Sequence, residues 1–201
     1  MAGTSIAIID SGGANIASLQ YALQRLGHDA LLTTDGAEIQ AAGRVILPGV
    51  GAARNAMDKL REHRLLDVIR GLQQPVLGIC LGMQLLAEAS EEENVDCLGI
   101  IPGVASKLPG SPNCPVPNMG WCPIQKQSDH GLLDGLDSGD YFYFLHSYAL
   151  PLSAATIASA KHASRFAAIT GKQNFVAAQF NPERSSSAGS RLLRNFLGWS
   201  A

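Results

Sequence analysis

The fold is decided by the stretch Val76-Leu77-Gly78-Ile79-Cys80-Leu81-Gly82-Met83-Gln84, in which an apolar strand runs into a Gly-x-Cys-x-Gly turn and then into a helix. The two glycines give the room that a sharp strand-to-helix corner needs. A cysteine at that corner faces the unpaired N–H groups and the positive dipole end of a helix expected over Leu81–Ala89, which favour a thiolate and can hold an oxyanion. We therefore predict that Cys80 is a nucleophile. The alternative is a buried, inert cysteine in a packed strand.

Outward from this corner, strand patterns alternate with helix patterns. Ser5–Asp10 is a continuous apolar run, as expected for a strand covered on both faces, and further strands are expected at Ala30–Thr33 and Arg44–Leu47. The last third of the chain instead has the pattern of an antiparallel meander, followed by an amphipathic helix; its strands are expected at Ala155–Ala160, Ala167–Thr170 and Phe175–Phe180. We predict an α/β fold with a doubly wound, mostly parallel sheet, flanking helices and an antiparallel extension. A length of 201 residues with 46% hydrophobic content suits a single domain over residues 1–201.

Composition excludes several classes of function. The net charge of −2 and the pI near 6.2 give no basic excess for nucleic acid. The pair Gly12-Gly13 lacks the rest of a Gly-x-Gly-x-x-Gly fingerprint, and no P-loop sequence occurs, so we expect no nucleotide site. No two of the four cysteines have Cys-x-x-Cys spacing, so we expect neither a metal nor a cofactor, and free thiols in a reducing compartment. Without a leader or a long apolar run, the chain is expected to be cytoplasmic and free of the membrane.

A glycine-rich loop follows the strand next to the nucleophile. Pro48-Gly49-Val50-Gly51 comes directly after Arg44–Leu47, and ligands of doubly wound sheets bind beyond the carboxyl ends of their strands. The backbone N–H groups of this loop can face an oxyanion, or the glycines can serve an ordinary turn.

Three further features have a structural and a functional interpretation. Glu91-Glu92-Glu93 is expected to be a solvated helix end, although a ligand ammonium can pair there. Trp121 is either a core residue or exposed for a partner. His146 ends the aromatic run Tyr141–Tyr148, and we interpret it as a core histidine rather than a catalytic one. The stretch between Cys97 and Pro117 is rich in Pro and Gly and is expected to be loop with short strands.

These motifs together resemble a known family. Gly78-Ile79-Cys80-Leu81-Gly82-Met83-Gln84, followed about a hundred positions later by Gln179-Phe180-Asn181-Pro182-Glu183, resembles the class I glutamine amidotransferases. The resemblance covers essentially the whole chain. It narrows to the glutaminase subunits of imidazole glycerol phosphate synthases through four further stretches: Pro48-Gly49-Val50-Gly51, Gly99-Ile100-Ile101, Met119-Gly120-Trp121 and Tyr143-Phe144-Leu145-His146-Ser147-Tyr148.

The resemblance implies a reaction and a set of roles. A Cys-His-Glu triad attacks the side-chain amide of glutamine, forms a glutamyl thioester, and releases ammonia and then glutamate. Cys80 would be the nucleophile, position 181 its base, and Glu183 the residue that orients that base. The remaining roles fall on the oxyanion donors Gly49, Val50, Gly51 and Leu81, and on the glutamine-binding residues Gln84, Ser147, Tyr148 and, for the ammonium, Glu92. The implied partner is the cyclase subunit, which is a (β/α)8 barrel that receives the ammonia, with Asn15 and Trp121 as candidate interface residues.

The chain departs from the family pattern at the base. The family motif reads Phe-His-Pro-Glu, whereas this chain has Asn181 in the histidine position. An amide can imitate one imidazole hydrogen bond but cannot accept the proton of a thiol. Asn118 is a second difference, since the related stretch reads Pro-His-Met-Gly-Trp. We therefore expect a glutaminase site of low activity.

Two other classes of function stay open at this point. The first is a non-catalytic subunit that binds glutamine or the cyclase without hydrolysing anything, for which Asn181 is the motivation. The second is a doubly wound cysteine hydrolase of another substrate class, for which Gln84, Ser147 and Tyr148 would be incidental.

Overall fold

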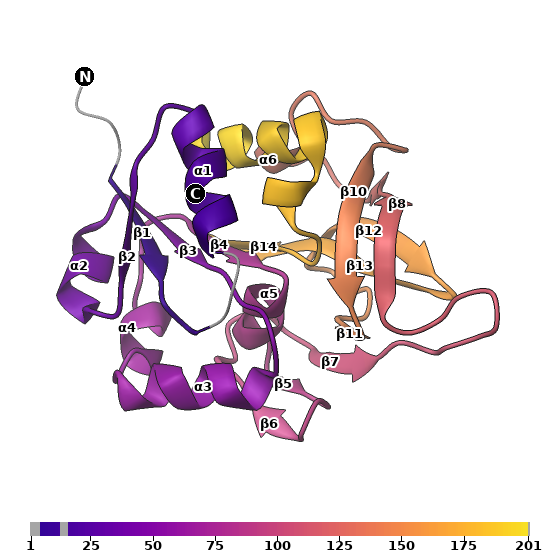
Figure 1. The fold of residues 1–201 in the computed structure, drawn as a ribbon, viewed down its shortest axis with the longest axis horizontal. Coiled ribbons are helices and arrows are strands. Elements are labelled where there is room, and N and C mark those ends of the chain that lie inside the picture. The colour runs from indigo at the N-terminus through magenta and orange to yellow at the C-terminus, as the bar shows by residue number, and fades with distance from the viewer. Residues whose placement is uncertain (1–4, 13–15, 201) are drawn as a thin grey trace.

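The computed structural model describes residues 5–12 and 16–200. Its centre is an eight-stranded sheet with six helices on its two faces (Figure 1). In spatial order, the strands are β2 (Ala30–Thr33), β1 (Ile6–Ile9), β3 (Arg44–Leu47), β4 (Val76–Ile79), β14 (Phe175–Ala178), β13 (Ser164–Lys172), β12 (Thr156–His162) and β9 (Gln125–Lys126). The first five pair in parallel and the last three in antiparallel fashion, which confirms the predicted doubly wound sheet with an antiparallel extension.

Helices cover both faces of the parallel part. The helices are α1 (Ile16–Arg25), α2 (Gly36–Ala41), α3 (Ala53–Glu62), α4 (Leu66–Arg70), α5 (Leu81–Leu86) and α6 (Ser186–Gly198). Along β1, Ile6 and Ile8 pack in one apolar cluster with α1 and α6, while Ala7 and Ile9 pack in a second cluster with α2 to α5 (Figure 1). Burial on both faces explains why β1 is a continuous apolar run rather than an alternation of apolar and polar residues.

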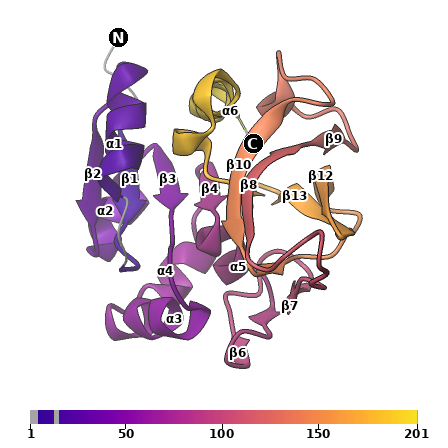
Figure 2. The same cartoon turned by 45° about the vertical axis from the view of Figure 1, so that its right-hand side comes forward.

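Two smaller sheets stand beside the large one. The strands β8 (Asn118–Pro123) and β10 (Tyr141–His146) form an antiparallel ribbon, which Figure 2 shows in front of β12 and β13. The second small sheet contains β11 (Tyr148–Ala149), β7 (Val104–Lys107), β5 (Ala89–Ser90) and β6 (Val95–Asp96). The 3-10 turn η2 (Pro182–Arg184) leads into α6, and the 3-10 turn η1 (Gly131–Leu133) contacts α6 through the bond from Asn195 Nδ2 to Leu132 O. The stretch between Cys97 and Pro117 is loop with the short strand β7, as predicted.

Three predicted elements differ from the structure. The helix predicted over Leu81–Ala89 ends at Leu86, because the carbonyl groups of residues 85–87 accept hydrogen bonds from residues 98–101. The acidic run Glu91-Glu92-Glu93 is therefore not a helix end; it follows strand β5. The predicted meander strand Phe175–Phe180 ends at Ala178 and pairs in parallel with β4 on one side, so β14 joins the two parts of the sheet.

Candidate functional site

Cys80 lies at a strained corner between β4 and α5. Its backbone has φ 55° and ψ −109°, a left-handed conformation that a residue with a side chain adopts at a cost. A Cβ atom added to Gly82 would lie 1.8 Å from the carbonyl oxygen of Leu47, and one added to Gly78 would lie 2.7 Å from Leu86 Cδ1. Both glycines are thus required by close packing, as the sequence predicted.

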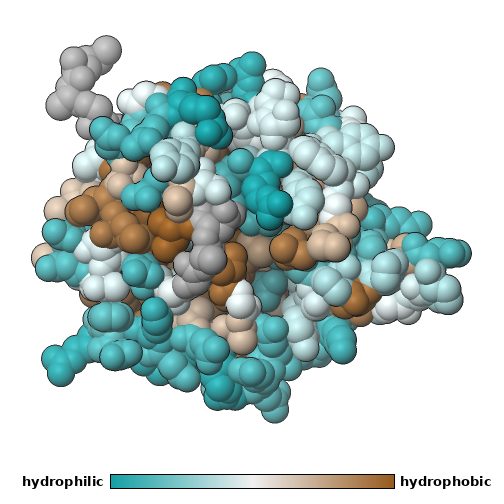
Figure 3. Space-filling view, in the orientation of Figure 1, coloured by the Kyte–Doolittle hydropathy of each residue, from teal (hydrophilic) through white to brown (hydrophobic). Residues whose placement is uncertain are grey.

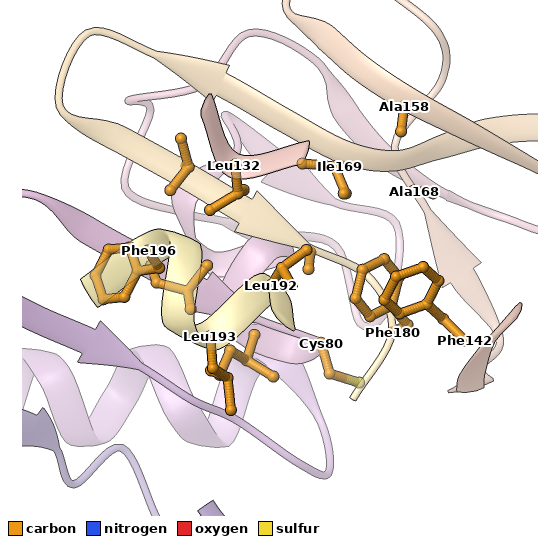
Figure 4. Close-up of a cluster of buried hydrophobic side chains, with 14 of the residues drawn as sticks. Cys80, Leu132, Phe142, Ala158, Ala168, Ile169, Phe180, Leu192, Leu193 and Phe196 are labelled. Carbon is orange, nitrogen blue, oxygen red and sulfur yellow. The ribbon is translucent and has the colours of Figure 1, made fainter. Parts of the chain in front are cut away.

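The protonation state predicted for Cys80 is wrong in this structure. Cys80 is part of the apolar cluster that contains Phe180 (Figure 4), and its Sγ donates to the carbonyl oxygen of Leu145 at 3.7 Å. Burial raises the pKa of the Cys80 thiol to about 12; the Leu81 N–H lowers it and the Glu183 carboxylate raises it further. Removal from water therefore outweighs the helix N-terminus, and the sulfur is a neutral thiol at pH 7.

The sheet brings position 181 to this thiol. Strands β4 and β14 are parallel neighbours, and Cys80 N donates to the carbonyl oxygen of Ala178 at 2.8 Å. Asn181 follows β14 as Cys80 follows β4, so both reach the same edge of the sheet. Asn181 N donates to Tyr143 O at 3.0 Å, and Ser185 Oγ donates to Asn181 O at 2.7 Å. These bonds fix a buried backbone at position 181.

Glu183 and Asn181 share a small cavity beside the turn after β1. It has a volume of about 20 Å³, and Ser11 and Pro48 also line it. Burial raises the pKa of the Glu183 carboxyl, against smaller lowering effects of a backbone hydrogen bond and of Arg184. A carboxyl group in this position can orient a side chain at 181.

A larger cavity of about 540 Å³ opens at Cys80. Nine of the predicted site residues line it: Val50, Gly51, Cys80, Leu81, Gln84, Glu92, Ser147, Tyr148 and Asn181. They come from five segments of the chain, which meet at the carboxyl ends of β3, β4 and β14 and at the end of β10. We call this space the catalytic cavity.

The glycine loop after β3 packs against the corner. Val50 and Gly51 line the catalytic cavity, and Gly51 has a φ of +90°. Gly49 lines the smaller cavity, and a Cβ added to it would lie 2.9 Å from Leu81 Cβ. The loop and the first residue of α5 are therefore in contact beside the cavity that Cys80 lines.

His146 is a buried histidine whose two ring nitrogens are both bonded. Nδ1 lies 2.9 Å from the carbonyl oxygen of Tyr148 and Nε2 lies 3.0 Å from Asn118 Nδ2. Since a carbonyl only accepts and an amide nitrogen only donates, Nδ1 carries the proton and Nε2 accepts. Burial lowers the pKa of His146 to about 4, with smaller effects from the Tyr148 carbonyl, which raises it, and from His162, which lowers it. The interpretation as a core histidine agrees with this geometry.

Asn118 has a clear task in this network. Its Oδ1 accepts from Cys122 Sγ at 3.6 Å while its amide nitrogen donates to His146. One donor and one acceptor are needed, and asparagine supplies both.

Glu92 performs a structural task as well as lining the cavity. Its Oε2 accepts from Ala53 N at 3.0 Å and so binds an N–H at the start of α3, whose preceding residue Ala52 has no side-chain cap. Its neighbour Glu93 pairs with Arg54 at 3.7 Å.

The ribbon of β8 and β10 presents an exposed apolar face. Trp121 is 50% exposed and packs edge-on against Tyr143, with ring centroids 6.1 Å apart, so the interpretation as a core tryptophan is wrong. Met119, Tyr141 and Leu145 are exposed on the same two strands. We call Met119, Trp121, Tyr141 and Leu145 the ribbon face. The other candidate interface residue, Asn15, lies outside the described residues.

The cavity has four lining residues that sequence reasoning missed: Pro117, Leu145, His146 and Arg184. Arg184 is the most informative, since its guanidinium carbon lies 4.5 Å from the centroid of the Tyr143 ring at the border of the ribbon face. Its position directly after Glu183 was a usable signal.

Two other kinds of feature, a cluster of metal ligands and a membrane-spanning helix, are absent from the described residues. Among residues 5–12 and 16–200, no three His, Cys, Asp or Glu side chains are grouped to hold a metal ion. Nor does any described helix have the length and apolar character to span a membrane. Over α3, the surface in Figure 3 is hydrophilic, whereas apolar side chains are scattered across the middle of that face.

Comparison with known proteins agrees with this geometry. The family model described as "Glutamine amidotransferase class-I" matches residues 7–198. The subunit HisH of imidazole glycerol phosphate synthase from Xanthomonas axonopodis pv. citri is 49% identical over 194 residues, which cover 96% of this chain and 97% of that one. HisH 2 from Legionella pneumophila is 51% identical over 192 residues, with 96% of each chain covered.

Solved structures share the fold. One from Thermoplasma acidophilum, described as part of a putative GMP synthase, has a TM-score of 0.76 at 22% identity, with 98% of this chain and 94% of that chain covered. Another, described as a glutamine amidotransferase, has a TM-score of 0.75 at 19% identity, and the match covers 96% of this chain and 97% of that chain.

Proposed function

Because this chain belongs to the class I glutamine amidotransferase family, we propose that it is the glutaminase subunit of an imidazole glycerol phosphate synthase, in histidine biosynthesis. It hydrolyses glutamine to glutamate and ammonia and passes the ammonia to the cyclase subunit. The observation that carries the proposal is the meeting of Cys80, Asn181 and Gln84 in one cavity, from segments about a hundred residues apart, in a chain about half identical to HisH subunits.

The reaction uses a thioester on Cys80. The thiol loses its proton, the sulfur adds to the side-chain carbonyl carbon of glutamine, and the nitrogen leaves as ammonia after it gains a proton. Water then adds to the thioester carbonyl, the carbon–sulfur bond breaks, and glutamate leaves while the Cys80 thiol is regenerated. The N–H of Leu81 and those of residues 49–51 are our proposed oxyanion donors, supported by the contact of Gly49 with Leu81 and by Val50, Gly51 and Leu81 lining the same cavity as Cys80.

We assign the recognition of glutamine to four residues that line the cavity along with Cys80. Gln84 lies one helical turn beyond Cys80, and Ser147 and Tyr148 follow β10. Glu92 is our candidate partner for the ammonium, supported by its carboxylate at the cavity wall.

Proton transfer is the weak step. Position 181 holds an amide, which is not a base, and the pKa of Cys80 is raised to about 12. Glu183 therefore has no imidazole to orient. We propose that this chain hydrolyses glutamine slowly while its binding cavity is intact.

The second candidate function is a non-catalytic binding subunit, and the amide at position 181 beside the Cys80 thiol favours it. A neutral thiol beside an amide suits binding without turnover. The two candidates differ in one respect: a slow glutaminase forms glutamate through Cys80, whereas a binding subunit forms none.

The test is glutamate formation from L-glutamine by the chain mixed with the cyclase subunit of its own organism and the cyclase's substrate. We expect a low rate that falls to background in the matched Cys80→Ala complex and that drops when the cyclase is omitted. A rate equal with and without the cyclase contradicts the coupling. A rate unchanged by Cys80→Ala contradicts the thioester.

The cyclase is proposed to dock on the ribbon face. An exposed apolar patch beside the catalytic cavity would place the ammonia exit at the interface. We expect Trp121→Ala to weaken cyclase binding about ten-fold or more, because half-buried tryptophans are frequent interface anchors. Leu31→Ala, at an exposed site on the edge strand β2, is the matched control and should leave binding unchanged. Equal effects of both variants would contradict the assignment.

We also propose that the chain works as one domain and in the cytoplasm. Both apolar clusters share the large sheet, which supports the first proposal. Four unpaired cysteines support the second.

A further inference from the structure

The amide of Gln84 is held in one orientation. Its Nε2 donates to the carbonyl oxygen of Tyr148 at 3.1 Å and to Gln179 Oε1 at 3.3 Å. The Tyr148 carbonyl can only accept, so the opposite orientation would place two oxygens face to face. Both N–H groups of Gln84 are thereby engaged, and its carbonyl oxygen is the polar atom left to meet a ligand in the catalytic cavity.

The lining of the catalytic cavity holds a second acceptor. The Glu92 carboxylate lines the same cavity, and only its Oε2 is bonded to Ala53 N. An amide oxygen and a carboxylate together suit a group that donates several hydrogen bonds and carries positive charge. For glutamine, that group is the α-ammonium.

The side chain of Gln179, which accepts from the Gln84 amide, is a polar group in a fully buried position. Its side chain is completely buried, and its Nε2 has no hydrogen-bond partner among the residues that the structure describes. A buried N–H without a partner destabilises a fold, whereas an apolar residue of similar size would not. Stability therefore does not explain the choice of glutamine, but the contact of its Oε1 with Gln84 does.

We propose that Gln179 is a positioning residue for substrate recognition. Its Oε1 acts with the Tyr148 carbonyl to hold Gln84, so that the Gln84 oxygen is turned toward the ammonium of the substrate. Without the Gln179 acceptor, only the Tyr148 contact fixes the amide, so Gln84 is held less firmly and its oxygen is directed less well at the ammonium. This inference rests on the proposed function and adds the atom by which the amino group is recognised.

The test compares two ligands that differ in the amino group. L-Glutamine and glutaramate, which lacks the α-ammonium, are titrated calorimetrically into the full chain and into Gln179→Met and Gln179→Glu. Methionine keeps the volume and removes the acceptor, while glutamate keeps acceptor oxygens at the same distance from the backbone. We expect Gln179→Met to weaken L-glutamine binding about ten-fold and glutaramate binding less than two-fold. Gln179→Glu should retain most of the preference for L-glutamine.

The outcomes separate the alternatives. Equal weakening of both ligands, or of neither, overturns the positioning role. In a Gln84→Met background, Gln179→Met should no longer change the preference, and a change that persists also overturns it. If Gln179→Met fails to fold, Gln179→Leu, which also removes the acceptor, takes its place in both backgrounds. An unaltered chain that binds neither ligand contradicts the proposed function itself, whereas one that binds both equally contradicts only the recognition of the ammonium by Gln84 and Glu92.

Discussion

Asn181→His should convert this chain into a fast glutaminase. Position 181 lines the catalytic cavity together with Cys80, and it lines the smaller cavity together with Glu183, so an imidazole there can meet the thiol and be oriented by the carboxyl group. The base would take the thiol proton during attack and return it to the leaving ammonia.

The size of the effect follows from the buried thiol. With a pKa of about 12 instead of the ordinary 9.0, Cys80 has about a thousand-fold less thiolate at neutral pH than an ordinary thiol. Loss of a general acid–base by itself removes roughly 10²–10⁴ of rate. We therefore expect Asn181→His to raise kcat by roughly 10²–10⁴, which is about 3–5 kcal/mol of activation free energy.

The assay is glutamate formation in the complex with the cyclase subunit, with the unaltered chain and Asn181→His measured in parallel. Asn181→Gln is the matched control, because it lengthens the side chain without adding a base. Asn181→His combined with Cys80→Ala should be inactive. If the unaltered chain turns over as fast as Asn181→His, another group serves as the base and the assignment of position 181 is wrong.

Three further predictions follow from burial, packing and titration. Iodoacetamide at neutral pH should alkylate the partly exposed Cys114 faster than Cys80, as read by peptide mass spectrometry, and rapid labelling of Cys80 would contradict the buried thiol. In urea titrations, Gly82→Ala should lower the free energy of unfolding by about 3 kcal/mol or more, because the new Cβ would overlap a carbonyl oxygen of β3. Gly198→Ala is the control and should change the free energy of unfolding little, because no atom lies within 4 Å of its new Cβ. The pKa of His146 is about 4 in the folded chain against an ordinary 6.5, so between these pH values the unfolded chain binds a proton that the folded chain does not. The free energy of unfolding should therefore fall by roughly 3 kcal/mol as the pH drops from 6.5 to 4. A His146→Gln variant whose free energy of unfolding fell by the same amount would contradict this assignment.

Local patterns were sufficient for the scaffold. Continuous apolar runs indicated the inner parallel strands β1, β3 and β4, because burial on both faces leaves few polar positions in them, whereas the edge strand β2 exposes Leu31 and Leu32. The spacing of Gly78 and Gly82 gave the corner, because no larger residue fits beside the backbone there. Most of the catalytic cavity was found in the same way, since its residues directly follow strands whose carboxyl ends meet at one edge.

Local patterns failed where distant segments compete for the same atoms. The helix after Cys80 ends early because residues 98–101 take its carbonyl groups, and that contact leaves no periodic signal. The acidic run around Glu92 looked solvated, yet one of its carboxylates binds the start of α3.

The sequence by itself therefore determined the parallel strands and the corner at Cys80, because these depend on residue types at short spacing, and its resemblance to a family supplied the hypotheses of a nucleophile at position 80 and a missing base at position 181. Only the tertiary structure decided the charge of Cys80 and the orientation of Gln84. The first depends on how much apolar surface surrounds the sulfur, which outweighs the N–H groups that a short motif reveals. The second depends on one backbone carbonyl and one buried amide from segments more than sixty residues away, and hydrogen-bond direction is fixed only where such groups meet.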